Sequence, residues 1–93
     1  MTTRIRITPE QVRTVARQFK SSSDQSQDMV NKLNTQVNAM GADWEGLTKE
    51  QFYQQFTEWK GRMEQFVVLL DDINKQLIAI ATRFENADRG QAG

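Results

Sequence analysis

Trp44-Glu45-Gly46 lies close to the middle of a chain of 93 residues and separates two long stretches with a helical pattern. On each side of it, apolar residues recur at the spacing that places them on one face of a helix. Gly46 supplies the backbone freedom that a change of direction needs. Trp44 either packs back over the end of a hairpin, has a role beyond packing, or does both. The sequence therefore predicts an all-α protein in which two long antiparallel helices form a hairpin.

The stretch before this elbow has apolar or small residues at alternating steps of four and three, the spacing of a heptad seam. Its members are Val12, Ala16, Phe19, Ser23, Ser26, Val30, Leu33, Val37 and Met40. Thr8 precedes Pro9 as a helix cap does, and Gln11 follows three residues after the cap. Gly41 is suited to the left-handed position that ends a helix. We predict the first helix over about residues 9–40.

The stretch after the elbow repeats the alternation with larger side chains. Its members are Phe52, Phe56, Trp59, Met63, Phe66, Leu70, Ile73, Leu77, Ile80, Phe84 and Ala87. Thr48 is placed as the cap of this helix, with Leu47 packing against Phe52. We predict the elbow at residues 41–47, the second helix at about 48–86 and a frayed tail at 87–93. Together they form a single helical-hairpin domain.

The composition excludes several kinds of chemistry. Lys plus Arg and Asp plus Glu are balanced at twelve each, so the net charge gives no attraction toward nucleic acid or an anionic membrane. The chain has neither histidine nor cysteine, which removes the usual general base, the thiolate nucleophile and the common transition-metal ligands. We therefore predict that the protein is not an enzyme, has no cofactor or bound metal, and has no nucleic-acid partner.

The longest uninterrupted apolar run, Phe66 to Leu70, is too short for a secretory signal peptide or a membrane span. These five residues also extend more than once round a helix, so they cannot all face the first helix. We predict that a second chain covers the remainder, so that two hairpins form a four-helix bundle. The residues expected at this dimer interface are Tyr53, Phe66, Val67, Leu69 and Ile78. Small residues at 21–23 either admit a partner's bulky helix closely or merely weaken the seam.

In these features the chain resembles the Trp-X-Gly family, the small helical-hairpin proteins similar to the early secreted antigenic target that type VII secretion systems export. The resemblance covers nearly the whole chain. It rests on the size, the missing cysteines and signal peptide, the opening Ile7-Thr8-Pro9-Glu10-Gln11, the elbow Trp44-Glu45-Gly46 and the long second helix. It implies an antiparallel dimer, either a homodimer or a heterodimer with a related hairpin protein.

The resemblance also implies an export signal composed of two parts from different subunits. Trp44 and Gly46 match the elbow part. The other part is a tyrosine followed after three residues by an acidic residue at the end of the second helix, and here Phe84 and Asp88 take those positions. Phe84 stands where the family has tyrosine and also continues the apolar stripe, so a purely structural role for it stays open. The resemblance implies that the membrane ATPase of the secretion system recognises this signal.

Three functions are compatible with the sequence. The leading hypothesis is a non-enzymatic substrate that folds in the cytoplasm and is secreted as a dimer without a cleavable signal peptide, either released or retained at the cell surface. The alternative is a cytoplasmic helical adaptor or chaperone for another secretion substrate. The third is a membrane-active effector that uses Phe66 to Leu70, which the predicted dimer would hide, so we expect no membrane interaction.

Overall fold

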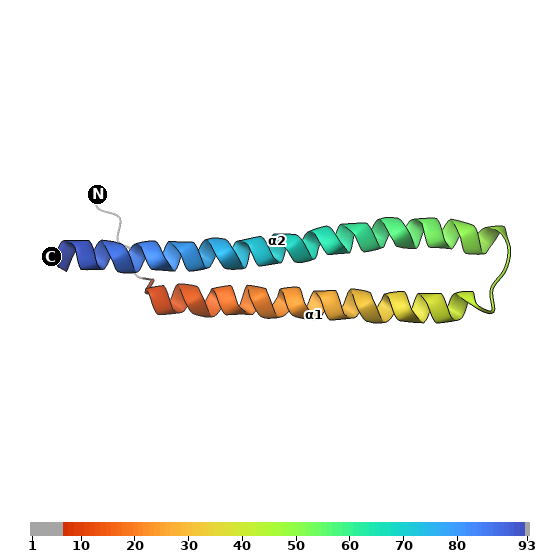
Figure 1. The fold of residues 1–93 in the computed structure, drawn as a ribbon, viewed down its shortest axis with the longest axis horizontal. Helices are drawn as coiled ribbons and strands as arrows, with labels where there is room; N and C mark the ends of the chain where they lie inside the picture. The colour runs from red at the N-terminus through yellow and green to blue at the C-terminus, as the bar shows by residue number, and fades with distance from the viewer. Residues whose placement is uncertain (1–6, 93) are drawn as a thin grey trace.

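The computed structural model describes the backbone of residues 7–92 and the side chains of residues 7–87. The described residues form two helices, α1 (Pro9–Gly41) and α2 (Leu47–Ala92), which run antiparallel along a molecule of 70 × 24 × 16 Å (Figure 1). The predicted all-α hairpin is therefore confirmed. Neither helix has a stretch that is long and apolar enough to cross a membrane, within the part of the chain that the structure describes.

The start of α1 follows from the sequence at its first turn. The backbone N–H of Gln11 donates to the hydroxyl of Thr8 at 3.1 Å, and the N–H of Thr8 donates to the Gln11 side chain at 2.8 Å. This reciprocal pair satisfies two of the N–H groups that a helix leaves without partners at its N-terminus. Pro9 occupies the first turn, where its missing N–H costs nothing. The predicted cap is confirmed.

The elbow differs from the prediction at both ends. α1 includes Gly41, and the following Ala42 is right-handed, with φ −62° and ψ −31°, so the predicted left-handed Gly41 is wrong. Within the described residues, positive φ occurs at Gly46, with a value of 110°. The carbonyl oxygen of Gly46 accepts a backbone hydrogen bond from the first turn of α2. The helix consequently begins at Leu47, and Thr48 lies inside its first turn instead of capping it.

The far end of α2 also differs from the prediction. The helix continues to Ala92, whereas the sequence predicted a frayed tail from residue 87. No proline follows Pro9, and the one glycine within residues 87–92, Gly90, lowers helix stability by only about 1 kcal/mol. α2 has 46 residues against 33 in α1, a difference of about 20 Å at 1.5 Å per residue. Much of this excess lies past the start of α1 (Figure 1).

The core between the helices is narrow and built largely from small side chains. Its buried residues are Val12, Ala16, Ser23, Val30 and Gly41 of α1, and Leu70 and Ala81 of α2. Most other members of the two predicted stripes, including Trp59, are only half-buried. The apolar stripes thus identified the helix faces that meet, but packing within one hairpin leaves part of each face exposed.

Candidate functional site

The elbow carries a row of aromatic rings. Trp44 is half-buried, and its ring lies 5.5 Å from that of Phe52 at an angle of 42°. Phe52 is followed along α2 by Phe56 at 6.2 Å, and Phe56 by Trp59 at 5.5 Å. Leu47, expected to pack against Phe52, is instead 69% exposed. Trp44 therefore lies against the start of α2, which agrees with a packing role, and keeps part of its surface open to solvent.

Two side chains of α2 hold the last turn of α1. The hydroxyl of Tyr53 donates to the carbonyl oxygen of Val37 at 2.8 Å, and Nζ of Lys49 donates to the carbonyl oxygen of Gly41 at 2.8 Å. The final carbonyls of a helix lack partners within it and carry a partial negative charge, so a cation there is favourable. These contacts fix the direction in which the chain leaves α1.

An open groove of about 710 Å³ lies beside this turn. Its lining residues are Asn38, Gly41, Ala42, Glu45, Gly46, Lys49, Glu50 and Tyr53. The groove therefore includes the glycine of the Trp-X-Gly motif. No group of three or more histidine, cysteine or acidic side chains is arranged to hold a metal ion in the described part of the chain.

The two parts of the predicted export signal lie far apart in one hairpin. Leu47 and Phe84 are separated by about 55 Å along α2 at 1.5 Å per residue. Phe84 is half-buried, and the backbone of Asp88 lies in α2, while the Asp88 side chain is outside the described residues. A single chain therefore does not bring the elbow and the far end of α2 together.

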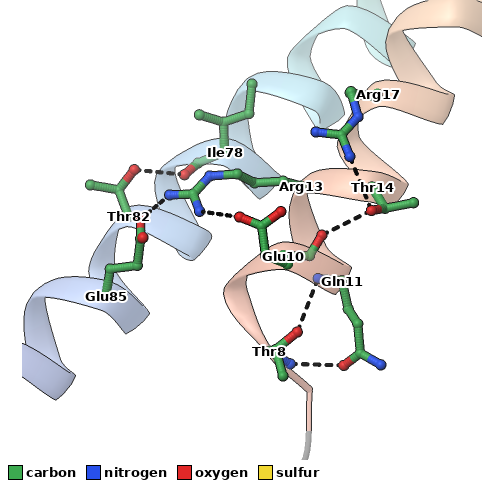
Figure 2. A network of polar contacts seen from close by, with 9 residues as sticks. All are labelled: Thr8, Glu10, Gln11, Arg13, Thr14, Arg17, Ile78, Thr82 and Glu85. Carbon is green, nitrogen blue, oxygen red and sulfur yellow. Dashed lines mark hydrogen bonds and ion pairs between the residues drawn. The ribbon is translucent and has the colours of Figure 1, made fainter.

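The far end of the hairpin contains an ion pair between the helices. Figure 2 shows Arg13 of α1 between Glu10 of its own helix and Glu85 of α2, next in sequence to Phe84. The Nη1 atom of Arg13 lies 3.4 Å from Glu10, and Nη2 donates to Glu85. Hydrogen bonding to Glu85, with a smaller effect of Glu10, raises the pKa of Arg13 above its ordinary value. The charged pair fixes the register of α2 against the first turns of α1.

A second interhelical ion pair defines one side of the hairpin. Nζ of Lys20 in α1 lies 3.5 Å from Asp71 in α2. Ile78 is seven residues from both Asp71 and Glu85, so it shares their side of α2. We call this side the ion-paired flank, and its residues are Arg13, Lys20, Asp71, Ile78 and Glu85.

The opposite side of the hairpin carries several exposed apolar side chains. Leu69 and Asp71 each lie about 100° from the buried Leu70, in opposite directions. Similar spacing places Val15 and Met29 of α1 opposite Arg13 and Lys20. We call this side the apolar flank, and its exposed residues are Val15, Met29, Met40, Phe66 and Leu69.

The structure therefore does not gather the five predicted interface residues on one surface. Phe66 and Leu69 lie on the apolar flank, and Ile78 lies on the ion-paired flank. Val67 is half-buried, and its carbonyl oxygen accepts a hydrogen bond from Ser23 of α1. The hydroxyl of Tyr53 is used within the hairpin. Sequence reasoning missed the roles of Lys49 and Tyr53 at the elbow, because these depend on how the helices pack and not on a local pattern.

Comparison with known proteins agrees with this geometry. The chain is 33% identical over 84 residues to an ESAT-6-like protein of Streptococcus agalactiae, an alignment that covers 90% of this chain and 88% of that protein. It is 28% identical over 85 residues to type VII secretion system extracellular protein A of Staphylococcus aureus, covering 91% of this chain and 88% of the relative. The EsxA crystal structure from Geobacillus thermodenitrificans superposes with a TM-score of 0.84 at 34% identity, covering 97% of this chain and 98% of that one.

The sequence model of one protein family matches most of the chain. This family is described as proteins of 100 residues with WXG, and the match covers residues 4–89. The Trp-X-Gly that it names is Trp44-Glu45-Gly46, whose tryptophan packs on α2 and whose glycine has the positive φ of the elbow. The chain therefore belongs to the WXG100 family of Trp-X-Gly proteins.

Proposed function

We propose that this protein is a substrate of a type VII secretion system and leaves the cell as a dimer, without a cleavable signal peptide. The WXG100 family is non-enzymatic, so the protein acts through its surfaces and not through catalysis. Its similarity to an extracellular protein of a type VII system supports the proposed route. The partner is a second copy or a related hairpin protein, and the membrane ATPase of the system recognises the dimer.

The observation that carries this proposal is the separation of the two motif parts within one chain. Trp44 and Gly46 lie at the elbow, and Phe84 and Asp88 lie about 55 Å away along α2. In an antiparallel dimer, the elbow of one chain lies beside the far end of α2 in the other. A signal formed in this way exists only in the assembled dimer, so the ATPase would distinguish dimers from single chains.

The apolar flank is the surface that we assign to the dimer interface. Phe66 is 45% exposed and Leu69 is 53% exposed in the single hairpin. Burying a large apolar side chain completely contributes about 1.5–3 kcal/mol, so several such residues from each chain favour association. The ion-paired flank offers charged groups that already have partners within the hairpin.

Replacing Trp44 with alanine tests the role of the elbow. We expect Trp44→Ala to abolish export while the dimer stays folded, because the indole lies at the end of the hairpin and away from Phe66 and Leu69. Export is measured by immunoblotting of culture supernatant and cell fractions, and dimerisation by analytical ultracentrifugation. Glu45→Ala is the matched control, since it changes the variable position of the same motif and should leave export unchanged.

Normal export of the Trp44→Ala protein would disprove the recognition role. The fractionation of the unaltered protein separates export from the adaptor alternative. An exported substrate accumulates outside the cell, whereas an adaptor for another secretion substrate stays in the cell fraction.

A further inference from the structure

Gly41 is the last residue of α1 and does not have a positive φ, so its own backbone conformation does not require glycine. The reason for it lies on the other helix. A Cβ atom built on Gly41 would meet the hydroxyl oxygen of Tyr53 at 1.9 Å, Cζ at 2.9 Å and Cε2 at 3.3 Å. The first two distances are shorter than real Cβ contacts. The Tyr53 ring therefore lies directly against the backbone of α1, in space that any other residue at position 41 would fill.

The Tyr53 ring is held in this place from three directions. Its hydroxyl donates to the carbonyl oxygen of Val37 at 2.8 Å. The edge of the ring packs against Phe52, with ring centres 6.1 Å apart at 84°. Nζ of Lys49 lies 5.8 Å from the ring centre and also donates to the carbonyl oxygen of Gly41. The ring cannot swing away from Gly41 without losing the bond to Val37, so a side chain at position 41 is not easily accommodated.

The same contacts determine where Trp44 lies. The N–H of Trp44 donates to the carbonyl oxygen of Gly41 at 3.3 Å, and its ring packs on Phe52, the neighbour of Tyr53. Trp44 is thus tied to both sides of the contact between Gly41 and Tyr53. A displacement of α1 relative to Tyr53 would move the indole relative to Phe52.

We propose that Gly41 and Tyr53 are positioning residues that set the path of the elbow and thereby the presentation of Trp44. The effect of this positioning on export rests on the function proposed above for Trp44. The contact itself is tested without export.

The first test compares two glycines by thermal unfolding of the full-length protein. Gly61 lies in α2 with nothing within 4 Å of a Cβ built on it, so Gly61→Ala should raise the melting temperature. Gly41→Ala should lower it, against helix propensity. In a Tyr53→Ala background the obstacle is gone, so adding Gly41→Ala should raise the melting temperature as Gly61→Ala does. A rise with Gly41→Ala in the presence of Tyr53 would overturn the proposal, as would an equal fall in both backgrounds.

The second test follows Trp44 directly. A Trp59→Phe background keeps a ring at position 59 and leaves Trp44 as the sole tryptophan. In that background Gly41→Ala should shift the fluorescence emission of Trp44 to longer wavelength and increase its quenching by acrylamide, because the displaced indole is more exposed to water. Gly61→Ala should change neither. An unchanged spectrum for Gly41→Ala would show that the contact does not position the indole.

Export then tests the link to function. Gly41→Ala and Tyr53→Ala should each reduce export of a protein that still dimerises, while Gly61→Ala should not. If Trp44→Ala abolishes export but Gly41→Ala does not affect it, the positioning role in export is wrong and the proposed function stands. If Trp44→Ala itself is exported normally, the proposed function fails, and the thermal and fluorescence results still decide the role of the contact.

Discussion

Ser23 shows why the middle of α1 carries small side chains. It is 3% exposed, and its hydroxyl donates to the carbonyl oxygen of Val67 in α2 at 3.3 Å. The small residue thus admits the second helix of its own chain. The sequence had left open whether the serines admit a partner's helix or weaken the seam, and at Ser23 the occupant is α2 of the same hairpin.

Enlarging this side chain should destabilise the hairpin. We expect Ser23→Leu to lower the free energy of unfolding by about 1–3 kcal/mol, because added methyl groups force the closely packed helices apart. Urea unfolding followed by circular dichroism measures the change. Ser21→Leu is the control at an exposed neighbour and should change the free energy by no more than about 0.5 kcal/mol. Equal effects of the two substitutions would contradict the close packing at Ser23.

Single residues differ in how far the sequence predicts their roles. Thr8 and Gln11 were predicted correctly because the capping pair acts over three residues of one turn. Gly41 was misread as a left-handed helix end because such a glycine is the commonest local explanation. Its actual neighbour, Tyr53, is twelve residues away on the other helix, and only the packing of the two helices brings them together.

At the scale of the helices, the two ion pairs of Asp71, one with Lys75 in α2 and one with Lys20 in α1, make the stability of the hairpin pH-dependent. Hydrogen bonding and the charge of Lys75, with a smaller contribution from Lys20, lower the pKa of Asp71 below its ordinary value of 3.8, against the opposing effect of burial. A carboxylate with a lowered pKa in the folded state stabilises that state above the unfolded pKa. The stabilisation is lost as the pH falls through the folded pKa.

We therefore expect Asp71→Asn to lower the urea midpoint near neutral pH, and the difference from the unaltered protein to shrink as the pH falls below 3.8. Urea titrations over a pH series measure this. Asp72→Asn is the control, since Asp72 is exposed and makes no ion pair among the described residues. A difference between Asp71→Asn and the unaltered protein that stayed constant at low pH would contradict the assignment.

The helix boundaries show where sequence patterns stop being informative. The pattern predicted both helices and their facing sides, because the heptad spacing is sustained over many turns. It failed at the C-terminal end of α2, which continues past Ala87, the last residue of the stripe. Helix formation there depends on the preceding helix, since adding a residue to an existing helix requires no new nucleation.

At the scale of the whole molecule, the narrow core leaves the large apolar side chains of the apolar flank exposed. We expect Phe66→Ala combined with Leu69→Ala to weaken the dimer by about 100-fold or more, because both chains of a symmetric pair lose the same buried groups. Analytical ultracentrifugation over a concentration series measures this. Ile78→Ala, on the ion-paired flank, should leave the measured mass of the dimer unchanged. Dissociation by Ile78→Ala alone would move the interface to the other flank.

The candidate site was predictable in part. The residues of the Trp-X-Gly motif and their place at the elbow follow from the sequence, because the motif interrupts two strong helical patterns. Leu69 and Ile78 are nine residues apart, which places them about 180° apart on a helix, so helical spacing alone separates them. Which of these sides faces which part of α1 did not follow from the sequence, because it depends on the ion pairs of Arg13 and Lys20 with α2.

Gly46 has a φ of 110° and empty space where a Cβ atom would lie. An L-amino acid at this position would therefore be disfavoured by its own backbone and not by any neighbour. A residue of the opposite chirality would adopt this backbone conformation without that penalty. The requirement at the glycine of the motif is thus one of handedness and not of size.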